Sequence, residues 1–282
     1  SSFQIDKSEN HPVETGKLNK KEKGNGKKGL GKSGKLPLDL GVKRTRGLIV
    51  DRFFTKPELH PYDEVLWDSR NTVITNPDGS IVFQMDDAEV PSSWSQLATD
   101  IAASKYFRKA GVPNTERETS VKQLIHRVTH TVRTAGEKFG GYFKTEEDAE
   151  NFEMELKHLL VHQKLAFNSP VWFNCGLHQE YGIEGSGGNF YWNPVSDKIE
   201  VTKTAYENPQ CSACFIQSVS DDLMAIFDLA KNEARIFKYG SGTGSNFSKI
   251  RGHMEKLSGG GLSSGLMSFL EVLDRGAGAT KS

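Results

Sequence analysis

The stretch "SACFIQSVSDDLMAIFDLAKNEARIFKYG", residues 212–240, decides the fold. It begins with a short apolar run at 214–219 that lacks clean alternation, as expected for a strand buried on both faces. Ser220 or Asp221 can cap a following helix, and Gly240 can close its end. The apolar residues of that helix share one face, and they are Leu223, Ile226, Phe227, Ala230, Ala234 and Phe237. The stretch therefore predicts a buried strand that leads directly into an amphipathic helix.

The segments on either side extend this pattern. The run "FNSPVWFN", 167–174, is expected to be a second buried strand, and 178–201 reads as a long polar and aromatic loop. After the helix comes the Gly-rich segment "SGTGSNFSKIRG", 241–252. A last helix is expected through Leu262, Leu266, Phe269, Leu270 and Leu273. The order strand, strand, helix, Gly-rich segment, helix predicts an α/β layered or barrel architecture.

The region before residue 166 begins with a different pattern. The apolar run "GLIVDRFFTK", 47–56, is expected to be a strand or short helix that enters a core. Two β-branched runs within 71–87 flank Asn76-Pro77-Asp78-Gly79, which is a strong turn signal. This region therefore contains a predicted β-hairpin.

Two helices are expected after the hairpin. The first lies within 119–140, and its apolar face comprises Val121, Leu124, Ile125, Val128 and Val132. The second begins where Thr145 and Asp148 form a capping box, and it is expected to end near Ala166. His126 and His130 lie four residues apart on the first helix, a spacing that some zinc sites use, but no third ligand is evident. Surface or packed histidines are the favoured interpretation.

The charges are segregated along a chain of 282 residues with zero net charge. Residues 1–46 carry 12 Lys and Arg against 5 Asp and Glu, so the rest of the chain is acidic, with 24 basic against 31 acidic residues. The first segment is rich in Gly and Lys without an apolar period, which predicts a disordered basic tail.

The composition also bears on the compartment. No stretch approaches the roughly 18 apolar residues that span a bilayer, and the first 30 residues lack the apolar core of a signal peptide. Three cysteines in a chain of this size do not form a disulfide scaffold. We therefore expect a cytoplasmic protein without a membrane partner, whose thiols are buried or chemically used.

The C-x-x-C spacing of Cys211 and Cys214 has several interpretations. A zinc ribbon needs a second such pair, and Cys175 alone cannot complete it. A thioredoxin-type dithiol is better served by a helix start, whereas two positions three apart on a strand point to opposite faces. Cys214 can instead be a thiol at the start of a strand that faces a partner from distant sequence, or an inert buried cysteine.

Three motifs together resemble a known family. Motifs of the ribonucleotide reductases resemble three stretches of this chain, "FNSPVWFN", "SACFIQSVSDDL" and "GSGTGSNFSKIRG". The sequences of these stretches are most similar to the adenosylcobalamin-dependent class. The resemblance covers about residues 47–282. It implies a mostly helical region with a β-hairpin at 47–165, followed at 166–282 by the first half of a ten-stranded α/β reductase barrel. It also implies radical chemistry that removes the 2'-hydroxyl of a ribonucleotide to make deoxyribonucleotides for DNA synthesis.

The resemblance assigns roles to several residues. Cys214 matches the first of two cysteines that supply the reducing equivalents and end as a disulfide, and its partner would lie beyond Ser282. Cys211 matches no functional position. The hydroxyl of Ser169 matches a substrate contact, with a turn-forming serine before proline as the alternative. The backbone at Ala213 and Gly242 matches further substrate contacts, where glycine allows a close approach of the chain.

An effector site is implied as well. Asp221, Asp222 and Leu223 match the family's specificity site for a deoxynucleotide, and Arg251 could pair with its triphosphate through a planar fork. The two aspartates are also a good helix start, because the helix macrodipole favours negative charge there.

Further partners follow from the resemblance. It implies adenosylcobalamin, most of whose contacts would lie outside this chain, a thioredoxin-type reductant and a dimer of the assembled enzyme. Since the radical-bearing cysteine is missing, we expect an N-terminal piece that works with a separate C-terminal reductase polypeptide. Two alternatives stay open, namely the large chain of an iron-dependent reductase and a non-catalytic nucleotide-binding or assembly module.

Overall fold

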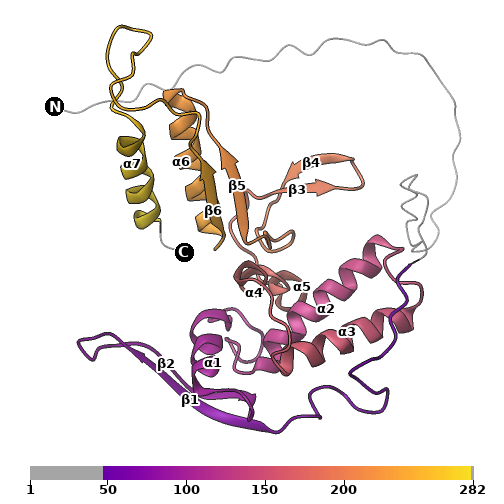
Figure 1. Cartoon of the computed structure of the whole chain (residues 1–282). Helices are drawn as coiled ribbons and strands as arrows, with labels where there is room; N and C mark the ends of the chain where they lie inside the picture. The colour runs from indigo at the N-terminus through magenta and orange to yellow at the C-terminus, as the bar shows by residue number, and fades with distance from the viewer. Residues whose placement is uncertain (1–46, 281–282) are drawn as a thin grey trace, which may run out of the picture. The chain divides into compact units, whose positions relative to one another are not determined.

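The computed structural model describes residues 47–280, which form a mixed α/β structure (Figure 1). The predicted basic tail, 1–46, lies outside the described residues. Within them, no helix is both long enough and apolar enough to cross a membrane.

The predicted hairpin is confirmed. Strand β1 (Trp67–Thr75) pairs antiparallel with β2 (Ile81–Pro91), and both strands extend beyond the predicted bounds. The turn between them is closed by the Asn76 side-chain amide, which donates to the Ser80 hydroxyl at 2.9 Å. Asp78 accepts the Ser80 backbone N–H at 2.9 Å, a local bond typical of turn aspartates.

Helices follow the hairpin. They are α1 (Gln96–Ile101), the π-helix η1 (Ala102–Tyr106), α2 (Val121–Phe139) and α3 (Glu146–Val161). The predicted capping box of α3 is present, and α2 has one as well, made by Ser120 and Gln123. The predicted apolar face of α2 packs into a core with η1, α3 and β2. Helix α3 ends at Val161 instead of Ala166.

The segment 47–56 is neither a strand nor a helix, so that prediction was wrong. It runs along α3, whose polar side chains satisfy its backbone. The Asp148 carboxylate accepts the Val50 N–H at 2.9 Å, and Glu155 accepts the N–H groups of residues 53–55 at 2.8 to 3.1 Å. Because these side chains replace a sheet partner, the apolar run stays extended and much of it is exposed.

The run 167–174 is also not a strand, and it forms α4 (Ser169–Asn174). The Asn168 side chain caps this helix by accepting the Val171 N–H, and Pro170 lies in the first turn, where its missing N–H costs nothing. Local capping therefore overrides the apolar pattern that predicted a strand.

The predicted loop at 178–201 contains regular structure. Helix α5 (Leu177–Tyr181) is followed by a hairpin of β3 (Phe190–Asn193) and β4 (Lys198–Val201). Glu200 of β4 accepts hydrogen bonds from Tyr191 and Asn193 across the pair, at 3.2 and 3.0 Å. Four-residue strands are too short for the sequence period to reveal.

The deciding stretch and the Gly-rich segment after it form a strand, helix, strand unit. Strand β5 (Cys214–Ser218) leads through α6 (Leu223–Lys238) to β6 (Gly242–Asn246), which pairs parallel with β5 beside α6 (Figure 1). The Gly-rich segment thus contains a strand that the sequence did not predict. Strand β5 is not buried on both faces, because its residues alternate between exposed and half-buried.

The helices of this unit also differ in detail from expectation. The N-cap of α6 is Asp222 instead of Ser220 or Asp221. The buried positions of α6 are Ile226, Leu229 and Glu233. The buried face shares Ile226 with the predicted one but is turned partly towards Leu229 and Glu233, and the predicted Leu223 and Phe227 are exposed. Helix α7 (Leu266–Ala279) begins after Leu262 and packs on α6.

The described buried apolar side chains form two clusters. The first joins β2, η1, α2, α3 and α4, and the second joins α6 with α7 and the residue that follows β5. The closed ten-stranded barrel is not shown within residues 47–280. The predicted domain boundary at residue 166 stays a prediction.

Candidate functional site

The parallel strand pair brings Ala213, Cys214 and Gly242 side by side. Cys214 is paired with Gly242 in the register of β5 and β6, and the Gly242 N–H donates to the Ala213 carbonyl at 2.7 Å. A Cβ at Gly242 would meet only that carbonyl oxygen, at 3.7 Å. Packing therefore does not require this glycine, and the space beside its backbone is open to a ligand. The roles assigned to the three residues stay predictions.

The two faces of the β5–β6 pair are different. The buried Glu233 of α6 accepts hydrogen bonds from the hydroxyls of Thr243 and Ser245, at 3.1 and 2.9 Å, so these residues face α6. Because side chains alternate along a strand, Gly242 and its pair Cys214 belong to the opposite face. The Cys214 thiol is exposed there. It is accessible on the face that α6 does not cover.

Ser169 lies beside the start of β6. It is the first residue of α4, and its hydroxyl hydrogen-bonds with that of Tyr106 at 3.1 Å. Together with Phe173 it lines a hollow of about 310 Å³, whose wall also includes Gly240 and Ser241. The structure therefore brings the predicted substrate hydroxyl next to the strand that carries Gly242.

Helix α4 packs against the segments that precede β5 and β6. The Asn174 side-chain amide donates to the carbonyls of Gln210 and Tyr239, at 2.8 and 3.3 Å. Gly240 has a φ of +75°, and a Cβ there would lie 2.7 Å from Cδ2 of Phe173. Only glycine fits this position without a shift of the aromatic ring.

A small polar network that sequence reasoning missed aligns the chain that enters β5. The Ser241 hydroxyl donates to the Ser212 carbonyl at 2.6 Å. The Gln210 amide donates to the Ser241 hydroxyl and accepts the Ser212 N–H. The only sequence signal was the presence of polar residues around the cysteines.

The buried Arg127 of α2 fixes the C-terminal end of α4. Its guanidinium donates to the Trp172 and Cys175 carbonyls and to the Glu118 carboxylate, each at 2.7 Å. The Arg127 and Glu118 side chains are 1% and 0% exposed. The Tyr181 hydroxyl also donates to Glu118, at 2.8 Å, and burial together with this carboxylate raises the pKa of Tyr181 above its usual value. One buried ion pair thus joins α2, α4 and α5.

The C-x-x-C motif does not act as one unit in the structure. Cys211 hydrogen-bonds with the distant Cys175, whereas Cys214 is exposed on β5. This bond, supported by the charge of Arg127, lowers the pKa of Cys175 despite burial. The same bond and burial raise the pKa of Cys211. Both thiols line a cavity of about 910 Å³, and their separation of 36 positions gave no signal for this pairing.

The predicted effector residues lie together at the start of α6. The Arg251 Nε donates to the Asp221 carboxylate at 2.5 Å, and the Arg251 backbone N–H contacts the same carboxylate at 3.3 Å. Arg251 Nη1 donates to the Lys256 carbonyl at 3.1 Å. Asp222 is engaged as the cap of α6, whereas the Leu223 side chain is largely exposed. Asp221 and Arg251 therefore bind one another in this structure.

The paired histidines of α2 each contact a carboxylate. The His126 and His130 rings stack with centroids 5.1 Å apart. His126 lies 3.4 Å from Glu180, and His130 lies 3.3 Å from Glu153. The two imidazoles therefore have different acidic partners.

Comparisons with known proteins add a second line of observation. A family model described as "Class II vitamin B12-dependent ribonucleotide reductase" matches residues 68–163, and a ribonucleotide reductase barrel-domain model matches residues 212–282. A vitamin B12-dependent ribonucleotide reductase of Agrobacterium fabrum is 49% identical over 269 residues, covering 83% of this chain and 21% of the relative. One of Rhodopirellula baltica is 50% identical over 222 residues, covering 79% of this chain and 21% of the relative.

A shorter match extends to an archaeal protein. The vitamin B12-dependent ribonucleoside-diphosphate reductase of Thermoplasma acidophilum is 42% identical over 66 residues, which is 23% of this chain and 9% of that protein. The chain spans about a fifth of the length of the first two relatives.

Proposed function

The chain belongs to the vitamin B12-dependent, class II ribonucleotide reductase family, and from that membership we propose that it carries a redox thiol and substrate-facing backbone of such an enzyme. The whole enzyme reduces ribonucleotides to deoxyribonucleotides. The observation that carries the proposal is the register that sets Cys214 opposite Gly242 on the uncovered face of β5 and β6. Ser169 beside the start of β6 extends this surface.

The chemistry of Cys214 follows from its exposure and neighbours. In the overall reaction the 2'-hydroxyl leaves as water, a C–H bond replaces the C–O bond, and two thiols lose their hydrogens to form one disulfide. An exposed thiol on an open strand face can meet both a second thiol and an external dithiol reductant. Cys175 is buried and the half-buried Cys211 packs against the same core, whereas Cys214 is exposed, so we propose that the second thiol comes from reductase sequence outside residues 47–280, on the same or a separate polypeptide.

The hollow at Ser169 fits a sugar better than a corrin. Its wall contains the hydroxyl residues Ser169, Ser241 and Thr280, and no histidine or carboxylate that could approach cobalt. Hydroxyls and open backbone suit the hydroxyls of a ribose. Adenosylcobalamin, when bound to the enzyme, supplies the radical that starts the reaction. We place its contacts outside the residues described and derive no step through it from this chain.

Effector binding is proposed for the start of α6. The Asp221–Arg251 contact holds the guanidinium in place before a ligand arrives. A deoxynucleoside triphosphate would compete with Asp221 for the planar fork of Arg251, because phosphate and carboxylate use the same bidentate geometry. A dimer, a thioredoxin-type reductant and a cytoplasmic location remain predictions.

The test uses the complete reductase that contains this chain, with Cys214→Ser and Cys211→Ser as matched variants. We expect Cys214→Ser to reduce deoxynucleotide formation to background when adenosylcobalamin and a dithiol are supplied. Cys211→Ser should retain turnover, because that thiol binds Cys175 away from the open strand face. Supplying di- and triphosphate substrates in parallel would identify the substrate class.

Two outcomes would redirect the proposal. Full activity of Cys214→Ser would favour a nucleotide-binding or assembly module without a redox role. Activity that requires iron and not adenosylcobalamin would favour the alternative of an iron-dependent enzyme, against the family match.

A further inference from the structure

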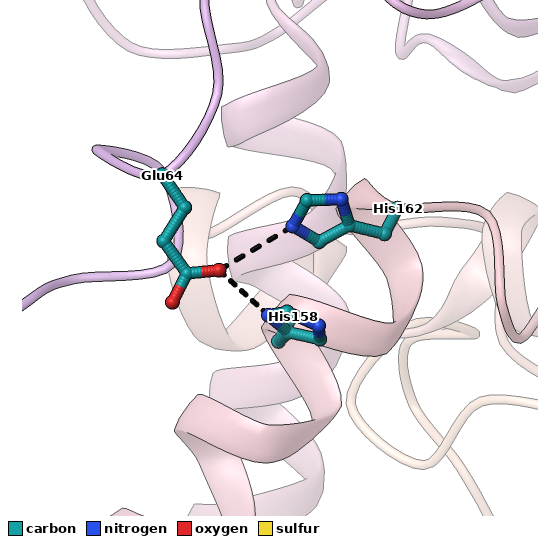
Figure 2. A group of neighbouring side chains, drawn as sticks. All are labelled: Glu64, His158 and His162. Carbon is teal, nitrogen blue, oxygen red and sulfur yellow. Dashed lines mark hydrogen bonds and ion pairs between the residues drawn. The ribbon is translucent and has the colours of Figure 1, made fainter. Parts of the chain in front are cut away.

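Three side chains from distant segments meet at the end of α3 (Figure 2). Glu64 lies in the turn before β1, His158 lies in the last turn of α3, and His162 is the residue that caps that helix. One carboxylate oxygen of Glu64 lies 2.7 Å from Nδ1 of His158 and 3.3 Å from Nε2 of His162. Among the residues that the structure describes, this is the one group of three or more potential metal ligands whose ligand atoms lie within 4.8 Å of one another.

The separations are close to those of a metal centre. Four-coordinate zinc binds imidazole nitrogen and carboxylate oxygen at about 2.0 to 2.2 Å, which puts neighbouring ligand atoms about 3.3 Å apart. The contact between Glu64 and His162 already has this length, and that between Glu64 and His158 would have to lengthen by about 0.6 Å. All three ligand atoms lie within 4.8 Å of one another, so an ion would require small shifts of the carboxylate and the imidazoles.

The surroundings hold the ligands in place. The His158 and Glu64 side chains are 10% and 15% exposed, and His162 is 29% exposed, so solvent has access from one side. The Phe54 ring stacks on His158 with centroids 5.3 Å apart and planes 10° apart. The backbone N–H of Phe54 is in turn held by Glu155 of α3. The imidazole therefore has little freedom to leave the cluster.

Helix electrostatics also favour a cation at this place. The last carbonyls of a helix carry a partial negative charge, which stabilises cations within the last turn. His158 and His162 lie at that end of α3, and Glu64 adds a negative charge. The site thus combines two neutral donors, one anionic donor and the negative end of a helix.

The tautomer that a metal needs is accessible at His158. Without an ion, the contact with the Glu64 carboxylate favours the tautomer with the proton on Nδ1, whereas metal binding at Nδ1 requires the proton on Nε2. Nε2 of His158 is buried, and no hydrogen-bond partner in residues 47–280 points at it. No donor group therefore opposes a proton on Nε2, but no acceptor among these residues stabilises it either, so the proposal rests on the ligand geometry and not on this nitrogen.

We infer that Glu64, His158 and His162 bind one divalent transition metal ion, with zinc as the best match. Two imidazoles and one carboxylate are a common zinc ligand set that leaves a fourth position for water. The ion would tie the turn before β1 to the end of α3, and it is separate from the proposed reductase site. The inference does not rest on the proposed function.

The test measures metal binding by the untagged full chain after removal of metal with a chelator. Isothermal titration with Zn²⁺ should give one strong site per chain, and Zn²⁺ should raise the thermal unfolding midpoint. We expect His162→Gln to weaken the affinity by at least about 100-fold, because it removes a direct ligand. His126→Gln is the matched control, since it breaks the other histidine pair at a four-residue spacing.

A second variant and a second metal make the outcome decisive. Glu64→Gln is isosteric and keeps an acceptor for His158, so it tests the site even if His162→Gln fails to fold. Co²⁺ bound to the wild-type chain should give the visible spectrum of a four-coordinate ion, and the spectrum should be lost in Glu64→Gln. Equal Zn²⁺ affinity of the wild-type and Glu64→Gln chains, or no Zn²⁺ bound by the wild-type chain at micromolar concentration, would overturn the inference and leave a hydrogen-bonded cluster.

Discussion

Replacement of Arg127 by methionine should destabilise the chain strongly. Methionine fills a similar volume but carries no charge and no donor. The change would leave the fully buried Glu118 carboxylate without its guanidinium and remove the donor from the Trp172 and Cys175 carbonyls. Helix α4, which carries Ser169, would lose the contact that fixes its C-terminal end.

The size of the effect follows from the burial of the pair. Removing one partner of a buried ion pair costs about 3 to 5 kcal/mol, because an uncompensated charge remains in the interior. Glu118 keeps the Tyr181 hydroxyl and the Arg108 N–H, at 2.8 and 2.7 Å, which favours the lower end, about 3 kcal/mol. Total stabilities are only about 5 to 15 kcal/mol, so this variant should lose about a fifth to three fifths of the total stability.

The assay is urea unfolding of the full chain followed by circular dichroism. Arg275→Met is the matched control, because the Arg275–Glu271 pair of α7 is 79% and 67% exposed and should cost less than about 0.5 kcal/mol. The double variant Arg127→Met with Glu118→Gln should recover part of the loss, since the stranded charge is gone. A loss below about 1 kcal/mol for Arg127→Met would refute the reasoning.

Three further predictions concern single positions. Iodoacetamide should modify the exposed Cys214 before Cys175, because the burial of Cys175 outweighs its lowered pKa. Mass spectrometry should find Cys214 modified first in the folded chain, and this preference should disappear in urea. Gly240→Ala should cost about 1 to 3 kcal/mol through its positive φ and the crowded ring of α4, whereas Gly79→Ala, with nothing within 4 Å, should cost only the backbone strain; equal losses in urea unfolding would contradict this. Burial opposes ionisation of Glu155, but its hydrogen bonds to Thr55 and to nearby backbone N–H groups prevail and lower its pKa in the folded chain. The stability that the Glu155 carboxylate contributes is therefore present above its unfolded pKa and is lost as the pH falls through its folded pKa. The difference in unfolding free energy between wild type and Glu155→Gln should shrink between about pH 6 and pH 3, and a constant difference would contradict the assignment.

The elements that the sequence predicted well are those with local signals. Helices α2 and α3 have capping residues, an apolar period and lengths of 19 and 16 residues, so each carries its own information. The β1–β2 hairpin has a strong turn signal between two β-branched runs. These features depend little on the rest of the fold, which is why they were predictable.

The missed elements depend on distant partners. Strand β6 has the sequence Gly-Thr-Gly-Ser-Asn, in which only Thr favours strands, and it is stabilised by pairing with β5. Helix α4 has six residues, too few to show a period, and only its Asn168 cap gave a signal. The extended run 47–56 is determined by carboxylates of α3 about 100 positions away.

The candidate site divides in the same way. Cys214, Gly242 and Ser169 were named from motifs, and the fold brings them near one another. The Cys175–Cys211 contact and the group of Glu64 with His158 and His162 arise only from tertiary structure. The second histidine pair had the same four-residue spacing as the first, but its carboxylate lies 94 positions from His158, beyond any local pattern.

The register that sets Cys214 opposite Gly242 belongs to a two-stranded parallel sheet in the described residues. A sheet of two strands is marginal in water, and long-range parallel pairing forms slowly because loop closure precedes any gain. The helical core around α2 and α3 rests on local contacts and can therefore form first. Amide hydrogens of β5 and β6 should exchange with solvent before those of α2. The proposed redox thiol would therefore gain its place opposite Gly242 late in folding, after the helical core has formed.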